Sequence, residues 1–142
     1  TPEARTDDGL DIAMIRVEPA ANRVIFAGAR LGLYLAENGV VEEVRGDRHS
    51  LGYRTSDPEY PFTAKTVPLR PGMSLYLATD GILGQAGGEK DLPFGKNRLK
   101  GFLEAAHDRP MAEQRTALLT AFAAYQGSQE QRDDITVIGL RL

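Results

Sequence analysis

The sequence predicts an α+β fold, a β-sandwich flanked by helices, and three observations support that prediction. Short apolar segments bounded by turn signals fill the first half of the chain, which is typical of strands. Two segments with helical spacing of apolar residues follow them. The last apolar segment, residues 134–142, comes after these helices. We therefore expect it to return as a strand into the sheet that the early strands form.

The first half contains six predicted strands, at residues 10–18, 23–29, 31–36, 40–44, 62–69 and 73–79. The first two are joined by a short turn that contains Pro19 and Asn22, so we expect an antiparallel hairpin. The next pair is joined by Asn38 and Gly39, which is the strongest hairpin signal in the chain.

Two helices are predicted in the second half. Residues 96–107 have apolar side chains at helical spacing, namely Leu99, Phe102, Leu103 and Ala106. Pro110 suits the first turn of the next helix, and Gly127 suits its end. We expect that helix to bury Leu118, Leu119, Phe122 and Tyr125.

Two loops stand out between these elements. Residues 84–95 contain four glycines and one proline, and we expect a flexible flap there. Residues 46–61 form a polar loop flanked by three basic residues, Arg45, Arg48 and Arg54. These arginines either bind a phosphate or an acidic surface, or are simply solvated.

Composition narrows the class of protein. The chain has 142 residues, 42% of them hydrophobic and 26% charged, which suits one globular domain. A net charge of −3 favours neither nucleic acid nor an anionic membrane as a partner. Cysteine is absent, which excludes disulfides and thiol chemistry and fits a cytoplasmic location. Because the chain begins with Thr1 in a polar segment, we expect it to be the C-terminal part of a longer domain.

The candidate site lies where a buried strand meets a carboxylate. Residues 75–79 are mostly apolar and end at Asp80, and Gly81 permits a tight turn or a close backbone approach to a ligand. Asp133 and Asp134 immediately precede the last predicted strand. If the two strands are neighbours, these oxygens can share a hard divalent cation. The alternative is that all three aspartates are ordinary turn residues.

The remaining polar residues give weaker signals. His49 and His107 have no partner at zinc spacing, and we expect both on the surface. Ser50 lies in no nucleophile-elbow pattern. Asp11 either supports the acidic site or is an exposed strand residue, and we favour the second interpretation.

Five motifs, in order along nearly the whole chain, resemble the SpoIIE-like branch of the metal-dependent protein phosphatases, the PPM or type 2C family. They are residues 26–29 (FAGA), 50–52 (SLG), 69–81 ending in the sequence TDG, 94–99 (Phe-Gly followed by Leu99) and 133–137 (DDITV). The contexts of residues 46–48, Gln114 and Gln131 further resemble phosphatase domains of bacterial membrane sensors.

The resemblance implies a phosphoserine or phosphothreonine phosphatase that uses two Mn²⁺ or Mg²⁺ ions. By position, Asp80 resembles the bridging metal ligand and Asp133 a second ligand, with Gly81 and Asp134 as their motif neighbours. The implied partner is a small phosphorylated STAS-type regulator, often an antagonist of an anti-sigma factor. The implied location is cytoplasmic, and an upstream sensor region, if the parent protein has one, anchors it to the inner membrane. The protein either forms a homodimer or acts as a monomer.

Two departures from the family pattern leave a rival interpretation. The family has an earlier Asp-Gly metal motif before a long helix, and the pair Asp8-Gly9 stands directly against a strand instead. Gly84 replaces an acidic residue that often follows the TDG motif. The rival is a non-catalytic sensing or binding module that retains the phosphatase fold. The presence of the Asp-Gly motif upstream of Thr1 would decide for the enzyme.

Overall fold

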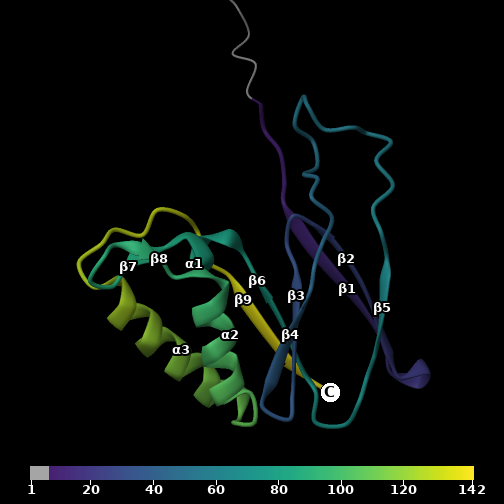
Figure 1. Cartoon of the computed structure of the whole chain (residues 1–142). Coiled ribbons are helices and arrows are strands. Elements are labelled where there is room, and N and C mark those ends of the chain that lie inside the picture. The colour runs from purple at the N-terminus through teal and green to yellow at the C-terminus, as the bar shows by residue number, and fades with distance from the viewer. Residues whose placement is uncertain (1–6) are drawn as a thin grey trace, which may run out of the picture.

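The computed structural model describes residues 7–142, and its helices and strands are shown in Figure 1. The strands are β1 (Ile12–Glu18), β2 (Arg23–Ala29), β3 (Leu33–Glu37), β4 (Val40–Val44), β5 (Lys65–Pro68), β6 (Ser74–Ala78), β7 (Ala86–Gly87), β8 (Leu92–Pro93) and β9 (Val137–Arg141). The helices are α1 (Asp80–Gly84), α2 (Gly95–Ala106) and α3 (Met111–Gln126), with a 3-10 turn at Pro19–Ala21. Residues 1–6 of the expected N-terminal loop lie outside the described part of the chain.

Two antiparallel sheets form the predicted sandwich. One has the strand order β1-β2-β5 and the other the order β4-β3-β6-β9. The last strand of the chain pairs with β6, so it returns into the sheet of the early strands as the sequence predicts. Both predicted hairpins are present, with β1 paired to β2 and β3 paired to β4. Asn38 and Gly39 have φ angles of +52° and +78°, which match the left-handed pair of a type I′ turn.

Successive side chains of β3 and β6 point to opposite faces of their sheet and so contribute to two separate apolar cores. Leu33 and Leu75 are fully buried between the two sheets, where they pack with β1, β2 and β5. Tyr34 and Tyr76, one position further along the same strands, face the helices. This period of two is what a sheet that is covered on both sides requires.

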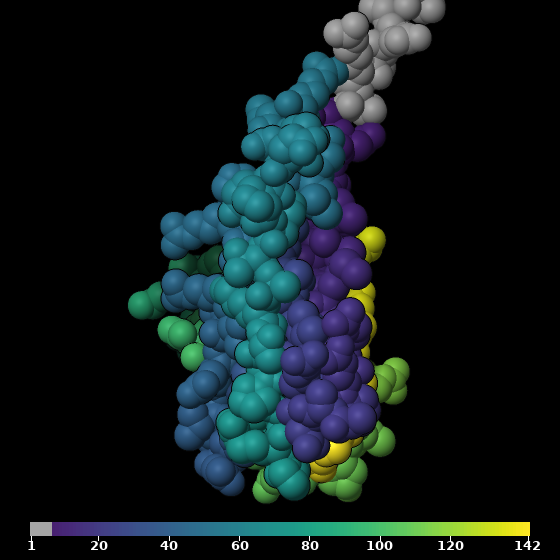
Figure 2. All heavy atoms as spheres, turned by 90° about the vertical axis from the view of Figure 1, so that its right-hand side faces the viewer, coloured from purple at the N-terminus to yellow at the C-terminus, as the bar shows by residue number. Residues whose placement is uncertain are grey.

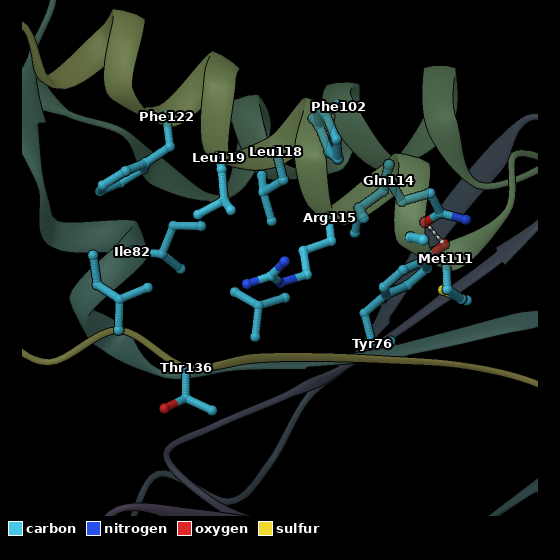
Figure 3. A pocket seen from close by; sticks show the side chains of 15 residues that line it. Tyr76, Ile82, Phe102, Met111, Gln114, Arg115, Leu118, Leu119, Phe122 and Thr136 are labelled. Atoms are coloured by element: carbon cyan, nitrogen blue, oxygen red, sulfur yellow. Dashed lines mark hydrogen bonds between the residues drawn. The ribbon is translucent and has the colours of Figure 1, made fainter.

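Helices α2 and α3 pack over the outer face of the four-stranded sheet (Figure 1). Helix α2 buries Leu99, Leu103 and Ala106, as its spacing predicts. Helix α3 has the predicted bounds but buries only Gln114, and Leu119 remains 57% exposed. Its expected apolar face is therefore only partly covered. Between α3 and β9 lies an open apolar cleft of about 580 Å³, where the Tyr76 hydroxyl donates to Gln114 Oε1 over 2.7 Å (Figure 3).

His107 is buried, so the expectation that it lies on the surface is wrong. The Gly39 backbone N–H donates to its Nε2 atom over 2.9 Å. The imidazole thus joins the end of α2 to the β3–β4 turn. His49 is exposed, as expected, and it stacks on Tyr60 with ring centroids 3.6 Å apart.

The segment predicted as a flexible flap, residues 84–95, is packed at residues 85–87 and Phe94, whereas Gly84 and residues 88–93 are exposed. It contains the end of α1 and the β7-β8 hairpin, and Gln85, Ala86 and Gly87 are buried. The Gly88 N–H donates to the Tyr125 carbonyl over 2.8 Å, and the Tyr125 hydroxyl donates to the Leu92 carbonyl over 2.7 Å. A Cβ on Gly87 would lie 2.1 Å from the Tyr125 carbonyl oxygen, so the glycines permit close packing on α3.

The long connection between β4 and β5 does project from the sandwich (Figures 1 and 2). The predicted strand over residues 62–69 shortens to β5 because Phe62 and Thr63 belong to this connection. Asp47 anchors it, since its Oδ2 accepts the Thr63 N–H over 2.8 Å. Hydrogen bonds from Thr63, of which this one is the main contributor, hold the pKa of Asp47 below its usual range.

The ends of β6 and β9 are locked together by a close backbone crossing. The Thr79 N–H donates to the Thr136 carbonyl over 3.0 Å, and the Thr136 N–H donates to Thr79 Oγ1 over 2.9 Å. Gly81 lies so close to this segment that a Cβ on it would sit 2.0 Å from the Asp134 carbonyl oxygen. A side chain at residue 81 would therefore push the two segments apart.

We predict that Gly81→Ala lowers the free energy of unfolding by about 1–3 kcal/mol, because overpacking against backbone cannot be relieved by a rotamer change. For a chain of this size, that corresponds to a fall in Tm of roughly 2–4 °C for each kcal/mol. Gly84→Ala, in the same short helix, is the matched control, because a Cβ there meets no heavy atom within 4 Å. Equal melting temperatures for the two variants would contradict the close crossing.

Candidate metal and phosphate site

Asp80 is placed at the edge of the sandwich by the strand that precedes it. Strand β6 is hydrogen-bonded on both sides, to β3 and to β9, so its end cannot shift independently. The sequence predicts a turn after Asp80, but Asp80 is the first residue of helix α1 instead. Its side chain reaches the solvent, at the mouth of two polar clefts.

Asp133 and Asp134 lie beside α1 because of the backbone crossing. Asp133 Oδ1 accepts the Asp134 N–H over 2.7 Å, and the Asp133 carbonyl accepts from Gln131 Nε2 over 2.9 Å. The Asp134 carbonyl is the atom that packs against Gly81. Gly81 therefore makes the predicted close approach, but it approaches the backbone of the second acidic segment.

The electrostatics show that Asp80 is surrounded by other carboxylates. Partial burial raises the pKa of Asp80, and the negative charges of Asp11 and Asp133 raise it further. The positive charges of Lys96 and Arg30 act in the opposite direction. The structure thus brings Asp80 and Asp133 into electrostatic contact from positions more than 50 residues apart in the chain.

Asp11 belongs to this acidic group, so its interpretation as an exposed strand residue is wrong. It is half-buried just before β1, and its Oδ1 accepts the Ser50 hydroxyl over 2.5 Å. Arg30 Nε donates to the same Ser50 Oγ over 3.1 Å. The hairpin register could have revealed this, because Ile12 pairs with Ala29 and so places Asp11 next to Arg30.

Two polar clefts share one wall beside Asp80. The larger, of about 590 Å³, is lined by Asp11, Arg30, Arg48, His49, Ser50, Tyr53, Thr55, Ser56 and Asp80. The smaller, of about 300 Å³, is lined by Arg30, Gly32, Glu43, Arg45, Gly46, Asp47, Arg48, Asp80 and Lys96. Arg30, Arg48 and Asp80 line both clefts, so these two guanidinium groups and this carboxylate are common to both. Asp80 does not line the apolar cleft beside α3.

The donors fit hard divalent cations in chemical type but do not complete a metal site. Carboxylate oxygens are the ligands that Mn²⁺ and Mg²⁺ prefer, and a cation would offset the repulsion between Asp80, Asp133 and Asp11. Within residues 7–142, however, no group of three or more His, Cys, Asp or Glu side chains is arranged to hold a metal ion. Asp80 and Asp133 are therefore candidate ligands that need further donors. In the same part of the chain, no helix combines the length and apolarity needed to cross a membrane.

Comparison with solved structures finds close likeness to bacterial phosphatase domains. The SiaA-PP2C domain of Pseudomonas aeruginosa is 36% identical with a TM-score of 0.87, over 94% of this chain and 52% of that chain. The phosphatase domain of the cell fate determinant SpoIIE from Bacillus subtilis is 18% identical with a TM-score of 0.65, over 97% of this chain and 60% of that chain. A structure of the same domain presoaked with Mn has the same identity and TM-score, over 98% and 60% of the two chains.

The chain therefore spans about half to three fifths of the length of these phosphatase domains. No curated protein matches it. The family model of stage II sporulation protein E (SpoIIE) matches residues 5–142, nearly the entire sequence. The chain belongs to the SpoIIE family, and its fold is that of the PP2C-type phosphatase domains.

Proposed function

We propose that the protein that contains this chain is a metal-dependent phosphatase that hydrolyses phosphoserine or phosphothreonine on a small bacterial regulatory protein. The observation that supports this proposal is the backbone crossing that brings the segment of Asp80 close to that of Asp133 and Asp134, in a chain that belongs to the SpoIIE family. A STAS-type regulator as substrate and a parent protein anchored to the inner membrane rest on the sequence resemblance alone.

In this proposal, Asp80 and Asp133 hold Mn²⁺ or Mg²⁺ together with donors from outside residues 7–142. When bound, such ions supply a water of lowered pKa and offset negative charge on the phosphoryl oxygens. The chain itself contributes the spacing of the two carboxylates, which the Thr79–Thr136 hydrogen bonds fix. Asp80 remains accessible from both polar clefts, so a phosphorylated side chain can reach it.

A second candidate is a binding module that retains the phosphatase fold without activity. The observation in its favour is that the described residues do not complete a metal site. Because this chain covers only 52% of the SiaA-PP2C chain, the missing donors have room in the uncovered part of such a domain. An Asp-Gly motif upstream of Thr1 favours the enzyme, and its absence favours the binding module.

We predict that Asp80→Asn in the full-length protein lowers the hydrolysis rate of a phosphoserine peptide with Mn²⁺ by more than about 100-fold. Loss of a ligand should cost at least as much as loss of a residue that only orients one. Asp108→Asn, which removes an exposed carboxylate beyond α2, should leave the rate unchanged. Circular dichroism would verify that both variants are folded, and full activity of Asp80→Asn at saturating Mn²⁺ would refute the assignment.

A thermal melt of the 142-residue chain tests the site without activity. Ligand binding stabilises a fold by RT ln(1 + [L]/Kd), so an incomplete site should show no shift at micromolar Mn²⁺ and a rise in Tm at millimolar Mn²⁺. Asp80→Asn should blunt that rise, whereas Asp108→Asn should not. Ca²⁺ serves as the ion control. A large shift at micromolar Mn²⁺ would show that residues 1–142 hold a complete site.

The same melt without metal tests the repulsion at Asp80. The folded state raises the pKa of Asp80, so ionisation costs stability, and that cost grows as pH rises through the raised pKa. Asp80→Asn should therefore melt at a higher temperature than the wild type at pH 7, and the difference should shrink toward acidic pH. A lower Tm for the variant at pH 7 would contradict the repulsion.

A further inference from the structure

We propose that Arg30 and Arg48 form a subsite that binds the phosphoryl group of the substrate beside Asp80. This inference rests on the proposed function, because it names the residues that would recognise the phosphate of that reaction. Both arginines line both polar clefts, as Asp80 does.

The backbone places the two arginines on one side of Asp80. The Arg30 N–H donates to the Asp47 carbonyl over 2.8 Å, and the Asp47 N–H donates to the Gly28 carbonyl over 2.8 Å. The end of β2 is thereby tied to the start of the β4–β5 connection, in which Arg48 is the next residue. Arg30 has a φ of +63°, a left-handed conformation that is unfavourable for a residue with a Cβ. This strained geometry is maintained at the mouth of the candidate site.

The Nε atom of the Arg30 guanidinium is held by a hydrogen bond, and its two terminal nitrogens are left for a ligand. Its Nε donates to Ser50 Oγ, and the Ser50 hydroxyl in turn donates to Asp11. Among residues 7–142, no hydrogen bond or ion pair engages the two terminal nitrogens of Arg30. In that part of the chain Arg48 has no such partner either, and it is exposed where it lines both clefts.

Charge and space both favour a phosphoryl group in this position. The four ion pairs among the described residues include neither Arg30 nor Arg48, although both lie in clefts with carboxylates. The two clefts, of about 590 and 300 Å³, provide the space for a phosphoryl group. A phosphoryl dianion accepts paired N–H bonds from guanidinium groups, which makes arginine the preferred side chain for recognising it. The hydroxyls of Tyr53 and Thr55 line the larger cleft and can donate further hydrogen bonds, whereas those of Ser50 and Ser56 already donate within the protein.

A simpler role for Arg30 would be to hold the Ser50 loop through its Nε atom. That role predicts a loss of stability when Arg30 is changed, and it assigns nothing to Arg48. A phosphate subsite predicts weaker substrate binding in variants of either residue. Arg48 is therefore the decisive position, because its replacement breaks no hydrogen bond or ion pair with the described residues.

The experiment is steady-state kinetics of the full-length protein with Mn²⁺ and a phosphoserine peptide, with inorganic phosphate as inhibitor. Arg48→Gln and Arg30→Gln should each raise KM by about 10-fold or more, the loss expected for a hydrogen bond to a charged group. Each should raise the inhibition constant of phosphate by a similar factor. Arg30→Lys, which keeps the charge but not the paired geometry, should fall between Arg30→Gln and the wild type. Arg16→Gln is the matched control, because this exposed arginine on β1 lines neither cleft and, within residues 7–142, pairs with Glu18 alone.

Unchanged KM and unchanged phosphate inhibition in Arg48→Gln, with an active wild type, would overturn the subsite. If Arg30→Gln lowers the Tm, its kinetics also reflect lost stability, and the kinetics of Arg48→Gln then decide whether the subsite exists. If the wild type does not hydrolyse the peptide, the proposed function fails, and calorimetric titration with inorganic phosphate then judges the subsite by itself. Weaker phosphate binding in Arg48→Gln than in Arg16→Gln would support the subsite, and equal binding would overturn it.

Discussion

The contact between Gly81 and the Asp134 carbonyl is the constraint on which the candidate site depends. It is made possible by the absence of a side chain at residue 81, and it is reinforced by the hydrogen bonds between Thr79 and Thr136. These interactions hold two segments, more than 50 residues apart in sequence, at one edge of the sandwich. Because a carboxylate follows or precedes each segment, the same contact concentrates negative charge around Asp80. The pairing of β6 with β9 therefore also brings the two acidic segments together.

Two cationic side chains partly offset the negative charge that accumulates around Asp80. Arg30 and Lys96 counteract the repulsion from Asp11 and Asp133, although neither forms an ion pair with Asp80. Lys96 instead pairs with Glu43 over 2.5 Å. Asp80, Arg30 and Arg48 are exposed to solvent, so charges of both signs are accessible to a ligand that enters the clefts.

The sequence predicted the architecture well because its local signals agree with the tertiary structure. Alternating apolar residues, the Asn38-Gly39 turn and the Pro110 and Gly127 helix boundaries all correspond to observed elements. The prediction for residues 84–95 missed the β7–β8 hairpin, because glycine content does not reveal that Tyr125 packs against Gly87 and Gly88. His107 and Asp11 were misplaced for a related reason. Their partners, Gly39 and Ser50, are distant in sequence, so only pairing between elements reveals them.

The central claim is that Asp80 and Asp133 share one cation-binding site, and paramagnetic broadening by Mn²⁺ tests it most directly. Bound Mn²⁺ broadens the amide signals of residues near it, even when affinity is weak. In ¹⁵N-labelled protein, the signals of residues 79–82 and 132–135 should broaden together as Mn²⁺ is added, and Asp80→Asn should suppress both sets. Broadening of one set alone, or of neither at millimolar Mn²⁺, would contradict a shared site.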